Sequence, residues 1–207
     1  CETSIIKQDG TKQATQNNVP LVLMNSFATQ QDSLEKLSLF KQSNPKIPLY
    51  FLQHKVPKIT QSNFSAVEWP ENPDLEWCPP GHGDLFLALV TSGMMKNLLD
   101  NGIENIFVSN VDNLGAVLDM KILGYFVDND LPFLMEVTDR TPADRKGGHL
   151  AKLTNGRFVL RESAQCPKKD ESNFQDVDRH KYFNTNNLWI NLKKLDKLLK
   201  EKDYVLE

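Results

Sequence analysis

The stretch Pro20-Leu21-Val22-Leu23-Met24 is a short apolar run, and a second run of the same kind, Pro48-Leu49-Tyr50-Phe51-Leu52, ends just before Gln53. Apolar runs of this length between polar segments are typical of buried strands. The residues between them carry apolar side chains at helical spacing after Asp32 and Ser33, either of which can cap a helix. We therefore predict successive strand–helix steps in this part of the chain.

The same alternation continues through the rest of the sequence. The patterns predict, in order, a helix from Asp84 to about Asn101, a strand at 106–108, a helix from Leu114 to about Val127, a strand at 133–137, a hairpin turning at Asn155-Gly156, and a helix from about Leu192 to Lys202. For the polar residues 1–19 we predict a helix remnant followed by a loop. Strands that alternate with helices indicate an α/β fold with a mostly parallel, twisted sheet flanked by helices, here with a small β-hairpin insertion.

The composition excludes several classes of protein. The chain has 207 residues, of which 40% are hydrophobic and 25% charged, and this suits one ordered domain. Lys and Arg number 24 against 27 Asp and Glu, so a basic surface for nucleic acid is not expected. The longest apolar stretch, Leu85 to Val90, has six residues, far fewer than the roughly 20 that cross a bilayer. We therefore expect a soluble protein with neither nucleic acid nor a membrane as partner.

The three cysteines, Cys1, Cys78 and Cys166, are widely spaced, which argues against a disulfide framework and against a zinc site. A reducing compartment, and hence a cytoplasmic location, fits them best. The chain begins with Cys1 and shows no secretory signal segment. We expect that a segment was removed or that the chain is a piece of a longer one, with a lipid-modified Cys1 as the alternative.

The densest group of candidate functional residues is Trp77-Cys78-Pro79-Pro80-Gly81-His82-Gly83-Asp84, directly before a predicted helix. The prolines stiffen the approach, and the glycines allow a ligand to come close to the backbone. The helix N-terminus beyond them presents free N–H groups, and His82 can donate a hydrogen bond to a phosphate oxygen. The residues alone leave two interpretations open: a phosphate cradle, or a rigid turn with Asp84 as a helix cap.

Polar side chains follow the predicted strand at 106–108, in the segment Ser109-Asn110-Val111-Asp112-Asn113. In open α/β sheets ligands bind outside the carboxyl ends of strands, so a carboxylate and neighbouring carboxamides there can hold a metal and hydroxyl groups. Asp112 alone is not a complete magnesium site, and it would bind Mg²⁺ together with substrate phosphates. The alternative is that Asp112 and Asn113 only cap the next helix.

Two further polar segments leave the choice between binding and structure open. The segment 136–149 contains Lys146-Gly147-Gly148, where a backbone can approach a polar ligand, but its paired Asp and Arg residues favour a loop held by surface ion pairs. The segment Phe183-Asn184-Thr185-Asn186-Asn187-Leu188-Trp189 offers carboxamides suited to sugar hydroxyls. Asn-rich turns also occur for purely local reasons.

Together these segments resemble one family. The motifs P-P-G-H-G-D at 79–84, S-N-V-D-N-L-G-A at 109–116, E-V-T-D-R-T-x-A-D-x-K-G-G at 136–148 and F-N-T-N-N-L-W at 183–189 are similar to those of the UTP–glucose-1-phosphate uridylyltransferases, or UDP-glucose pyrophosphorylases. Residues 20–27 are similar as well, and the resemblance spans about residues 19–195. It implies a Rossmann-like, GT-A-like nucleotidyltransferase domain of carbohydrate metabolism. The implied reaction makes UDP-glucose and pyrophosphate reversibly from UTP and glucose 1-phosphate, with Mg²⁺.

The resemblance also implies binding roles, and it implies no residue that acts as general acid, general base or nucleophile. Around the uracil it places Met24, Gln53 and Gly81. It implies that His82 is a phosphate ligand on the glucose 1-phosphate side, that Asn110 contacts the nucleotide-sugar, and that Asp112 is the magnesium carboxylate. The residues implied to meet the glucose hydroxyls are Gly148, Glu162, Asn184 and Asn186.

The sequence departs from the family pattern in what it lacks. The glycine-rich loop L-x-G-G-x-G-T with its following Pro-Lys, which holds the UTP phosphates in the family, does not occur in the 207 residues. A second phosphate-binding lysine and the C-terminal β-helical domain are missing too. Residues 1–207 are therefore expected to form a single partial catalytic domain with little or no activity on its own. Cys78 stands where relatives often have Tyr.

Three alternatives to this function remain open at the level of sequence. A pyrophosphorylase for another UDP-sugar would carry similar motifs, and a non-catalytic fragment that binds a nucleotide-sugar would retain them. A metal-dependent glycosyltransferase fits less well, because Asp112 is followed by Asn113 and Leu114 and does not complete an Asp-x-Asp pair. The oligomeric state is not predicted.

Overall fold

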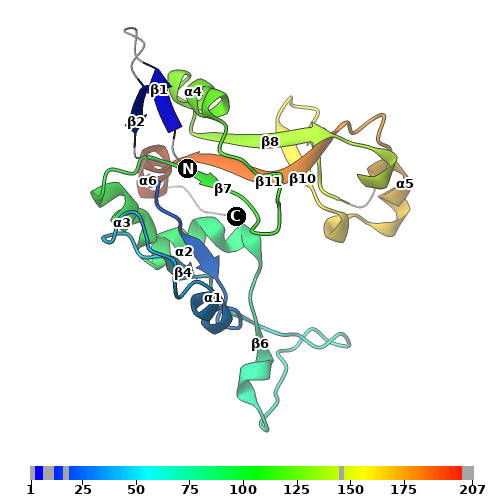
Figure 1. The fold of residues 1–207 in the computed structure, drawn as a ribbon. Coiled ribbons are helices and arrows are strands. Elements are labelled where there is room, and N and C mark those ends of the chain that lie inside the picture. Colours follow the sequence, from blue (N-terminus) through cyan, green and yellow to red (C-terminus); the bar gives the residue numbers. More distant parts are fainter. Residues whose placement is uncertain (1–2, 7–11, 16–18, 145–146, 202–207) are drawn as a thin grey trace. The chain divides into compact units, whose positions relative to one another are not determined.

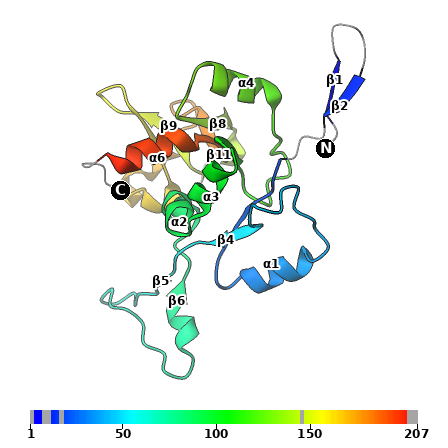
Figure 2. The ribbon, with the colours of Figure 1, turned by 90° about the vertical axis from the view of Figure 1, so that its left-hand side faces the viewer.

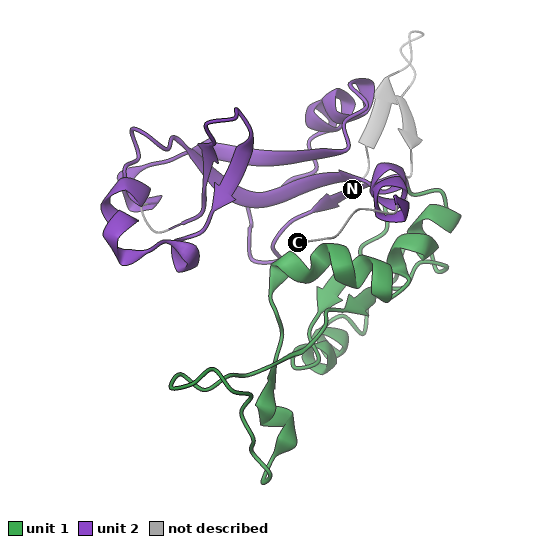
Figure 3. Cartoon of the chain, turned by 180° about the vertical axis from the view of Figure 1, so that it is seen from behind, with its two compact units in different colours: residues 1–103, 206–207 green, residues 104–205 purple. Residues whose placement is uncertain are grey.

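The computed structural model describes residues 3–6, 12–15, 19–144 and 147–201. The chain divides into two compact units, residues 1–103 with 206–207 (unit 1) and residues 104–205 (unit 2) (Figure 3). Each unit has its own sheets and helices. Within the described ranges, no helix has both the length and the apolar character that a bilayer crossing requires.

Unit 1 combines short strands with helices. Its elements are β1 (Thr3–Ile6), β2 (Lys12–Thr15), β3 (Leu23–Asn25), α1 (Gln30–Lys36), β4 (Tyr50–Leu52), β5 (Val56–Pro57), the 3₁₀ helix η1 (Pro73–Glu76), β6 (Trp77–Cys78), the 3₁₀ helix η2 (His82–Asp84), α2 (Leu85–Thr91) and α3 (Met94–Asp100). The predicted helix remnant near the N-terminus is wrong, because β1 and β2 pair as antiparallel strands. Their polar composition carried no period of two that could have indicated a strand.

The first strand–helix–strand step is confirmed. β3 and β4 pair in parallel, with Leu23 opposite Tyr50 and Asn25 opposite Leu52, and the chain passes through α1 between them (Figure 2). A parallel pair needs such a crossover, because its two strands run in the same direction. The carboxyl ends of the two strands therefore lie side by side, which places Gln53 next to Asn25.

Residues 53–80 form an arm that extends from β4 and returns to α2, with β5 and β6 pairing antiparallel at its base (Figure 1). Beyond the arm, the helix expected from Asp84 to about Asn101 is two helices. The break lies at Gly93, which adopts a left-handed conformation with φ of +77°. The predicted end at about Asn101 is confirmed: the N–H groups of Gly102 and Ile103 donate to the carbonyls of Leu99 and Leu98, a Schellman motif.

Unit 2 contains the larger sheet. Its elements are β7 (Asn105–Val108), α4 (Met120–Asp128), β8 (Phe133–Asp139), η3 (Pro142–Asp144), β9 (His149–Lys152), β10 (Phe158–Arg161), η4 (Ser163–Gln165), η5 (Lys168–Asp170), α5 (Glu171–Phe174), β11 (Tyr182–Asn191) and α6 (Leu192–Lys200). The helix expected from Leu114 begins only at Met120, because Asp119 is its cap and accepts hydrogen bonds from the N–H groups of Lys121 and Ile122.

The sheet of unit 2 corrects part of the predicted topology. β11 lies between β7 and β8 and runs antiparallel to both (Figure 1). The α/β class is confirmed, but parallel pairing occurs between β3 and β4, whereas the described pairings of the five-stranded sheet are antiparallel. β7 and β8 do run in the same direction, as expected for strands joined through α4. A strand that comes much later in the sequence separates them.

The hairpin predicted at Asn155-Gly156 is confirmed as β9 and β10, with Phe158 opposite Lys152. Gly156 has φ of +86° and its N–H donates to the Leu153 carbonyl. The core of the sheet lies around Trp189 of β11, which packs against Phe107 of β7 and Phe126 of α4 with ring centroids 4.7 and 6.4 Å away. Trp189 and Phe126 are each 1% exposed, so α4 is fixed on the sheet by apolar packing.

Candidate functional site

In unit 1 the predicted uracil residues gather at the carboxyl ends of β3 and β4. Met24 is the central residue of β3, opposite Phe51. Gln53 donates its backbone N–H to the Asn25 carbonyl at 2.9 Å, and its side-chain Oε1 accepts the Gly81 N–H at 3.2 Å. Gly81 has φ of +104°, a conformation that other residues rarely adopt. The structure thus brings Gln53 and Gly81 together at the carboxyl end of the strand pair, where ligands bind in open α/β sheets, while Met24 lies one residue before the end of β3.

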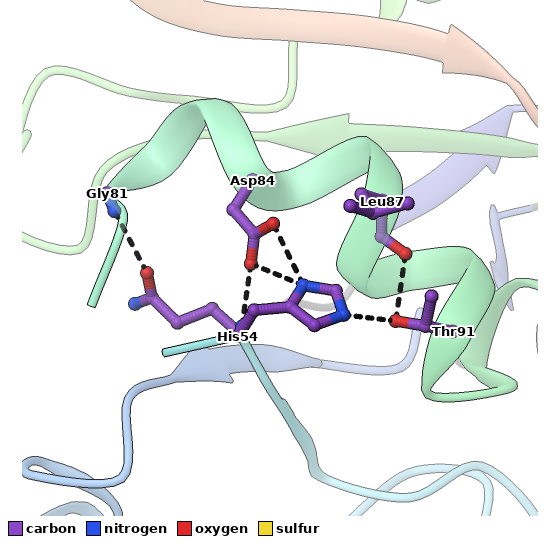
Figure 4. A network of polar contacts seen from close by, with 6 residues as sticks. His54, Gly81, Asp84, Leu87 and Thr91 are labelled. Atoms are coloured by element: carbon purple, nitrogen blue, oxygen red, sulfur yellow. Dashed lines mark hydrogen bonds and ion pairs between the residues drawn. The ribbon is translucent and has the colours of Figure 1, made fainter. Parts of the chain in front are cut away.

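The turn after Gly81 is closed by Asp84, whose N–H donates to the Gly81 carbonyl at 3.2 Å. Asp84 stands at the N-cap position of α2, as predicted, but its side chain makes no capping hydrogen bond. The carboxylate instead accepts hydrogen bonds from the backbone N–H of His54 at 2.7 Å and from His54 Nδ1 at 2.9 and 3.0 Å (Figure 4). His82, between Gly81 and Gly83, remains exposed.

His54 is a member of this group that we did not predict from the sequence. Its Nε2 lies 2.9 Å from the hydroxyl oxygen of Thr91, which is also 3.0 Å from the Leu87 carbonyl oxygen (Figure 4). The ring is therefore held from both sides, by Asp84 and by Thr91 of α2. The only sequence signal was position: His54 directly follows Gln53, at the end of a buried strand.

In unit 2, Asn110 and Asp112 lie exposed in the segment after β7. The alternative that Asp112 and Asn113 cap the next helix is wrong, because that helix begins at Met120. Asn113 instead accepts the Gly115 N–H and donates to Asn187 Oδ1 at 3.2 Å. Among the described residues no hydrogen bond or ion pair holds the Asp112 carboxylate, so its oxygens suit a hard cation such as Mg²⁺.

Asn184 and Asn186 lie in a bulge of β11. Two residues of β8, Val137 and Met135, are opposite Asn184 and Leu188, so β11 has more residues than its partner here. Asn186 has φ of +58°, and its N–H donates to Asn184 Oδ1 at 2.9 Å. Asn184 Nδ2 donates to Asn186 Oδ1 at 2.6 Å. The two carboxamides therefore form one hydrogen-bonded pair.

Gly148 and Glu162 lie beside this pair. The Asn184 N–H donates to the Gly148 carbonyl at 3.0 Å. A Cβ built on Gly148 would be 2.4 Å from Glu162 Oε1, so the carboxylate lies directly against the glycine backbone. The structure thus brings together the four predicted sugar ligands, Gly148, Glu162, Asn184 and Asn186. We refer to them as the carboxamide cluster.

Glu136 supports the bulge from β8 and was not singled out in the sequence. Its carboxylate accepts hydrogen bonds from Asn187 Nδ2 at 3.0 Å and from Trp189 Nε1 at 2.7 Å, and its carbonyl accepts the Thr185 hydroxyl at 2.7 Å. Asn187 also binds Asn113. One carboxylate thereby links the sheet core, the bulge and the segment that follows β7.

Unit 2 also contains a group of basic side chains around the buried His149. His149 is fully buried, stacks on His180 with centroids 4.1 Å apart, and contacts Phe174 at 4.5 Å. Burial lowers the pKa of His149 to about 4, and the positive charges of His180, Arg140 and Arg161 act in the same direction. Burial also lowers the pKa of His180. His149 Nδ1 lies 3.3 Å from the Leu150 carbonyl, and Nε2 has no hydrogen-bond partner among the described residues. The lowered pKa keeps the ring neutral at neutral pH.

The ion pairs predicted for the loop after β8 stay a prediction, because Arg145 lies outside the described residues, while Arg140 and Asp144 attract each other electrostatically. The Arg140 guanidinium donates to the carbonyls of Asp144, Phe174 and His180. The Asp144 carboxylate accepts the backbone N–H and the hydroxyl of Thr141, and these hydrogen bonds lower the pKa of Asp144. Backbone carbonyls and the Thr141–Asp144 hydrogen bonds therefore help to hold the described part of this loop.

The predicted site residues fall into two sets. Met24, Gln53, Gly81 and His82 belong to unit 1, and Asn110, Asp112 and the carboxamide cluster belong to unit 2. That both sets face one ligand stays a prediction. The described part of the chain contains no group of three or more His, Cys, Asp and Glu side chains arranged to hold a metal ion by themselves. Magnesium binding by Asp112 also stays a prediction.

Comparison with known proteins identifies relatives. The family model described as UTP–glucose-1-phosphate uridylyltransferase matches residues 2–207. The chain is 45% identical over 186 residues to UTP–glucose-1-phosphate uridylyltransferase 2 of Dictyostelium discoideum, covering 88% of this chain and 36% of that protein. It is also 45% identical over 190 residues to the enzyme of Encephalitozoon cuniculi, covering 92% of this chain and 37% of that protein.

Solved structures are similar over the same range. UDP-glucose phosphorylase from Trypanosoma brucei matches with a TM-score of 0.80 and 46% identity, over 92% of this chain and 43% of that one. A mutant UDP-glucose pyrophosphorylase from Leishmania major, solved in complex with UDP-glucose, matches with a TM-score of 0.77 and 41% identity, over 88% and 41% of the two chains. The chain therefore spans well under half the length of the relatives it matches.

Proposed function

Since the chain belongs to the UTP–glucose-1-phosphate uridylyltransferase family, we propose that it forms the uridine- and glucose-binding part of an enzyme that makes UDP-glucose and pyrophosphate reversibly from UTP and glucose 1-phosphate. The carboxamide cluster is the observation that carries this proposal. Its members are dispersed over three segments of unit 2, yet they are joined by hydrogen bonds and close contact. Carboxamides and a carboxylate together supply the donors and acceptors that sugar hydroxyls need.

In this proposal the nucleotide end binds in unit 1. Gln53 reads the polar edge of the uracil beside Met24 and Gly81, and the hydrogen bond between Gln53 and Gly81 supports a shared role. His82 donates to a phosphate oxygen from its exposed position in the turn. Asn110 contacts the nucleotide-sugar. The Leishmania major relative whose complex contains UDP-glucose supports this choice of ligand.

Asp112 is the proposed magnesium ligand. A carboxylate at the carboxyl end of β7, free of hydrogen bonds within the described residues, suits a cation that keeps most of its ligands from water and substrate phosphates. When bound, Mg²⁺ neutralises the charge that develops on the phosphates. The chain's own part is to position the two substrates.

The reaction needs no general base, because the phosphate of glucose 1-phosphate is already a nucleophile at neutral pH. Catalysis then consists of holding two anions in line and of stabilising charge on the transferred phosphate. We therefore propose binding residues and no catalytic acid, base or nucleophile. We further propose one nucleotidyltransferase domain, a cytoplasmic location, and little or no activity of the 207 residues alone, since they lack the glycine-rich triphosphate loop.

A mutational test uses the protein that contains this chain together with the rest of its reading frame. UDP-glucose synthesis from UTP, glucose 1-phosphate and Mg²⁺ is measured for the wild type and for Asp112→Asn. We expect a loss of turnover by about two orders of magnitude or more in the variant, with folding unchanged because Asp112 is exposed. A near-normal rate would remove Asp112 from the metal role, and an inactive wild type would overturn the proposed activity.

The same assay separates the alternatives. A panel of sugar 1-phosphates distinguishes glucose from galactose and N-acetylglucosamine as the substrate. Calorimetry with UDP-glucose on the full-length protein measures binding, and binding without turnover there would instead support a non-catalytic nucleotide-sugar-binding protein. Robust synthesis by the 207 residues alone would contradict the proposal that they are inactive.

A further inference from the structure

The turn that carries His82 is attached at both ends to the consecutive residues Gln53 and His54. Figure 4 shows the contacts between Asp84 and His54. At its start, the Gly81 N–H donates to the Gln53 side chain at 3.2 Å. At its end, the Asp84 carboxylate accepts two kinds of hydrogen bond from His54, one from the backbone and one from the ring. The position of the turn is therefore set by the end of β4.

The Asp84 carboxylate depends on His54. The Asp84 side chain is 7% exposed and the His54 side chain 38%. Leaving a buried carboxylate without donors costs free energy, because water cannot replace them. Removing the His54 ring therefore takes a donor from a group that has little access to solvent. We expect Asp84 to shift outward, and the turn to shift with it.

The His54 ring is itself oriented from α2. Thr91 Oγ1 lies 2.9 Å from Nε2 and 3.0 Å from the Leu87 carbonyl oxygen of the same helix, and its one hydrogen can serve either acceptor. Both ring nitrogens therefore have a polar neighbour, and Nδ1 faces the Asp84 carboxylate. Because Asp84 lies at one ring nitrogen and Thr91 at the other, the His54 ring is restricted to one orientation.

We propose that His54 is a positioning residue, which holds Asp84 and thereby sets the place of His82 relative to Gln53. This inference rests on the proposed function for the binding roles of Gln53 and His82. His54 makes no substrate contact in it. By holding Asp84, His54 keeps Gln53, which binds the uracil, at a fixed distance from His82, which binds a phosphate.

Three variants and a control test the proposal. His54→Leu removes the ring donor, whereas His54→Asn keeps a donor close to the place of Nδ1, and Thr91→Val removes the partner of Nε2. The control is Lys96→Ala, which removes an exposed ion pair with Asp100 from α3 of the same unit. Thermal unfolding of each variant shows that it is folded before any other measurement.

The first readout is coupling to His82 in the full-length protein. We expect His54→Leu to lower kcat/KM for UDP-glucose formation by about ten-fold, His54→Asn to restore it to within about three-fold, and Lys96→Ala to leave it unchanged. In a protein that already carries His82→Ala, His54→Leu should lower kcat/KM by less than about two-fold, because His54 acts through His82. An equal loss in both backgrounds would show a merely structural role and overturn the proposal.

The second readout does not need catalysis. Amide hydrogen exchange at Gly81 reports its bond to Gln53, and exchange at Asp84 reports the bond that closes the turn on the Gly81 carbonyl. We expect His54→Leu to raise both rates by about ten-fold, with a smaller rise in Thr91→Val. Lys96→Ala should leave them as in the wild type. An inactive wild-type protein would refute the proposed function. Hydrogen exchange would then still test whether His54 positions the turn. Unchanged exchange at both amides would overturn the positioning role.

Discussion

Gly148 lies so close to Glu162 that a Cβ on the glycine would be 2.4 Å from Oε1 and 2.8 Å from Oε2 of the carboxylate. Only glycine permits this approach. The contact joins the end of the loop after β8 to the segment that follows β10, and it brings two of the proposed sugar ligands together. A substitution here therefore separates an effect on binding from an effect on folding.

We predict that Gly148→Ala weakens the affinity for UDP-glucose by about ten-fold or more. The added methyl group displaces the Glu162 carboxylate, which is the flexible end of a side chain and can rotate away, so the free energy of unfolding should change by less than about 1 kcal/mol. Calorimetry with UDP-glucose and chemical denaturation measure the two effects. The control Gly124→Ala lies in α4 with open space around its Cβ, and its affinity should match the wild type. Equal affinity of Gly148→Ala and wild type would contradict the sugar-binding role.

Glu136→Leu should destabilise the protein by about 2–4 kcal/mol. The change leaves Trp189 Nε1–H and one Asn187 N–H without an acceptor in a mostly buried place. Glu136→Gln keeps one acceptor and should cost about 1 kcal/mol. Urea denaturation followed by tryptophan fluorescence measures both.

A matched control for Glu136 is Glu104→Gln, which affects a half-exposed carboxylate paired with Lys193. Surface pairs contribute less than about 1 kcal/mol, so this variant should unfold almost like the wild type. If Glu136→Leu and Glu104→Gln had the same stability, the described hydrogen bonds of Glu136 would not hold the bulge.

The stability of the protein should fall in acid because of His149. Its pKa is about 4 in the folded protein, against an ordinary value near 6.5, so the unfolded chain takes up a proton at a higher pH than the folded one. The contribution of the neutral His149 ring to the free energy of unfolding is complete above about pH 6.5. It is lost as the pH falls toward 4. The full loss for this group is about 3 kcal/mol.

Denaturation at several pH values checks this expectation. Between pH 7 and pH 4, the wild type should lose about 3 kcal/mol more than His149→Leu, in which the titrating group is absent. The comparison cancels the contribution of the carboxylates, which both proteins share. Parallel curves for the two proteins would show that His149 is not held neutral by its surroundings.

Gly93→Ala should destabilise the protein by about 1–2 kcal/mol, because φ of +77° is strained for an alanine even though no atom lies within 4 Å of its Cβ. Gly124→Ala, in a helix interior without a positive φ, should instead be neutral or stabilising by up to about 1 kcal/mol. Opposite signs in thermal unfolding would confirm that Gly93 terminates α2 by its conformation. A stabilising Gly93→Ala would mean that α2 and α3 can join.

Much of the secondary structure followed from local patterns. The apolar runs near Leu23 and Phe51 became β3 and β4, Asn155-Gly156 became a hairpin, and Gly102 ended α3, since each depends on residues a few positions apart. The insertion of β11 between β7 and β8 did not follow, because strand order is chosen by pairing between residues about 50 positions apart. The break at Gly93 was missed because an isolated glycine inside a helical pattern is usually tolerated.

The sequence by itself determined the family, through four ordered motifs, and with it the set of residues proposed to bind the ligand. Only the tertiary structure decided which of them touch: the bulge of β11 joins Asn184 to Asn186, the packing of the loop after β8 presses Gly148 against Glu162, and the end of β4 brings His54 to Asp84. The reason is physical. Periodicity and turn chemistry act over a few residues, whereas hydrogen bonds between distant side chains exist only after the sheet has brought their backbones together.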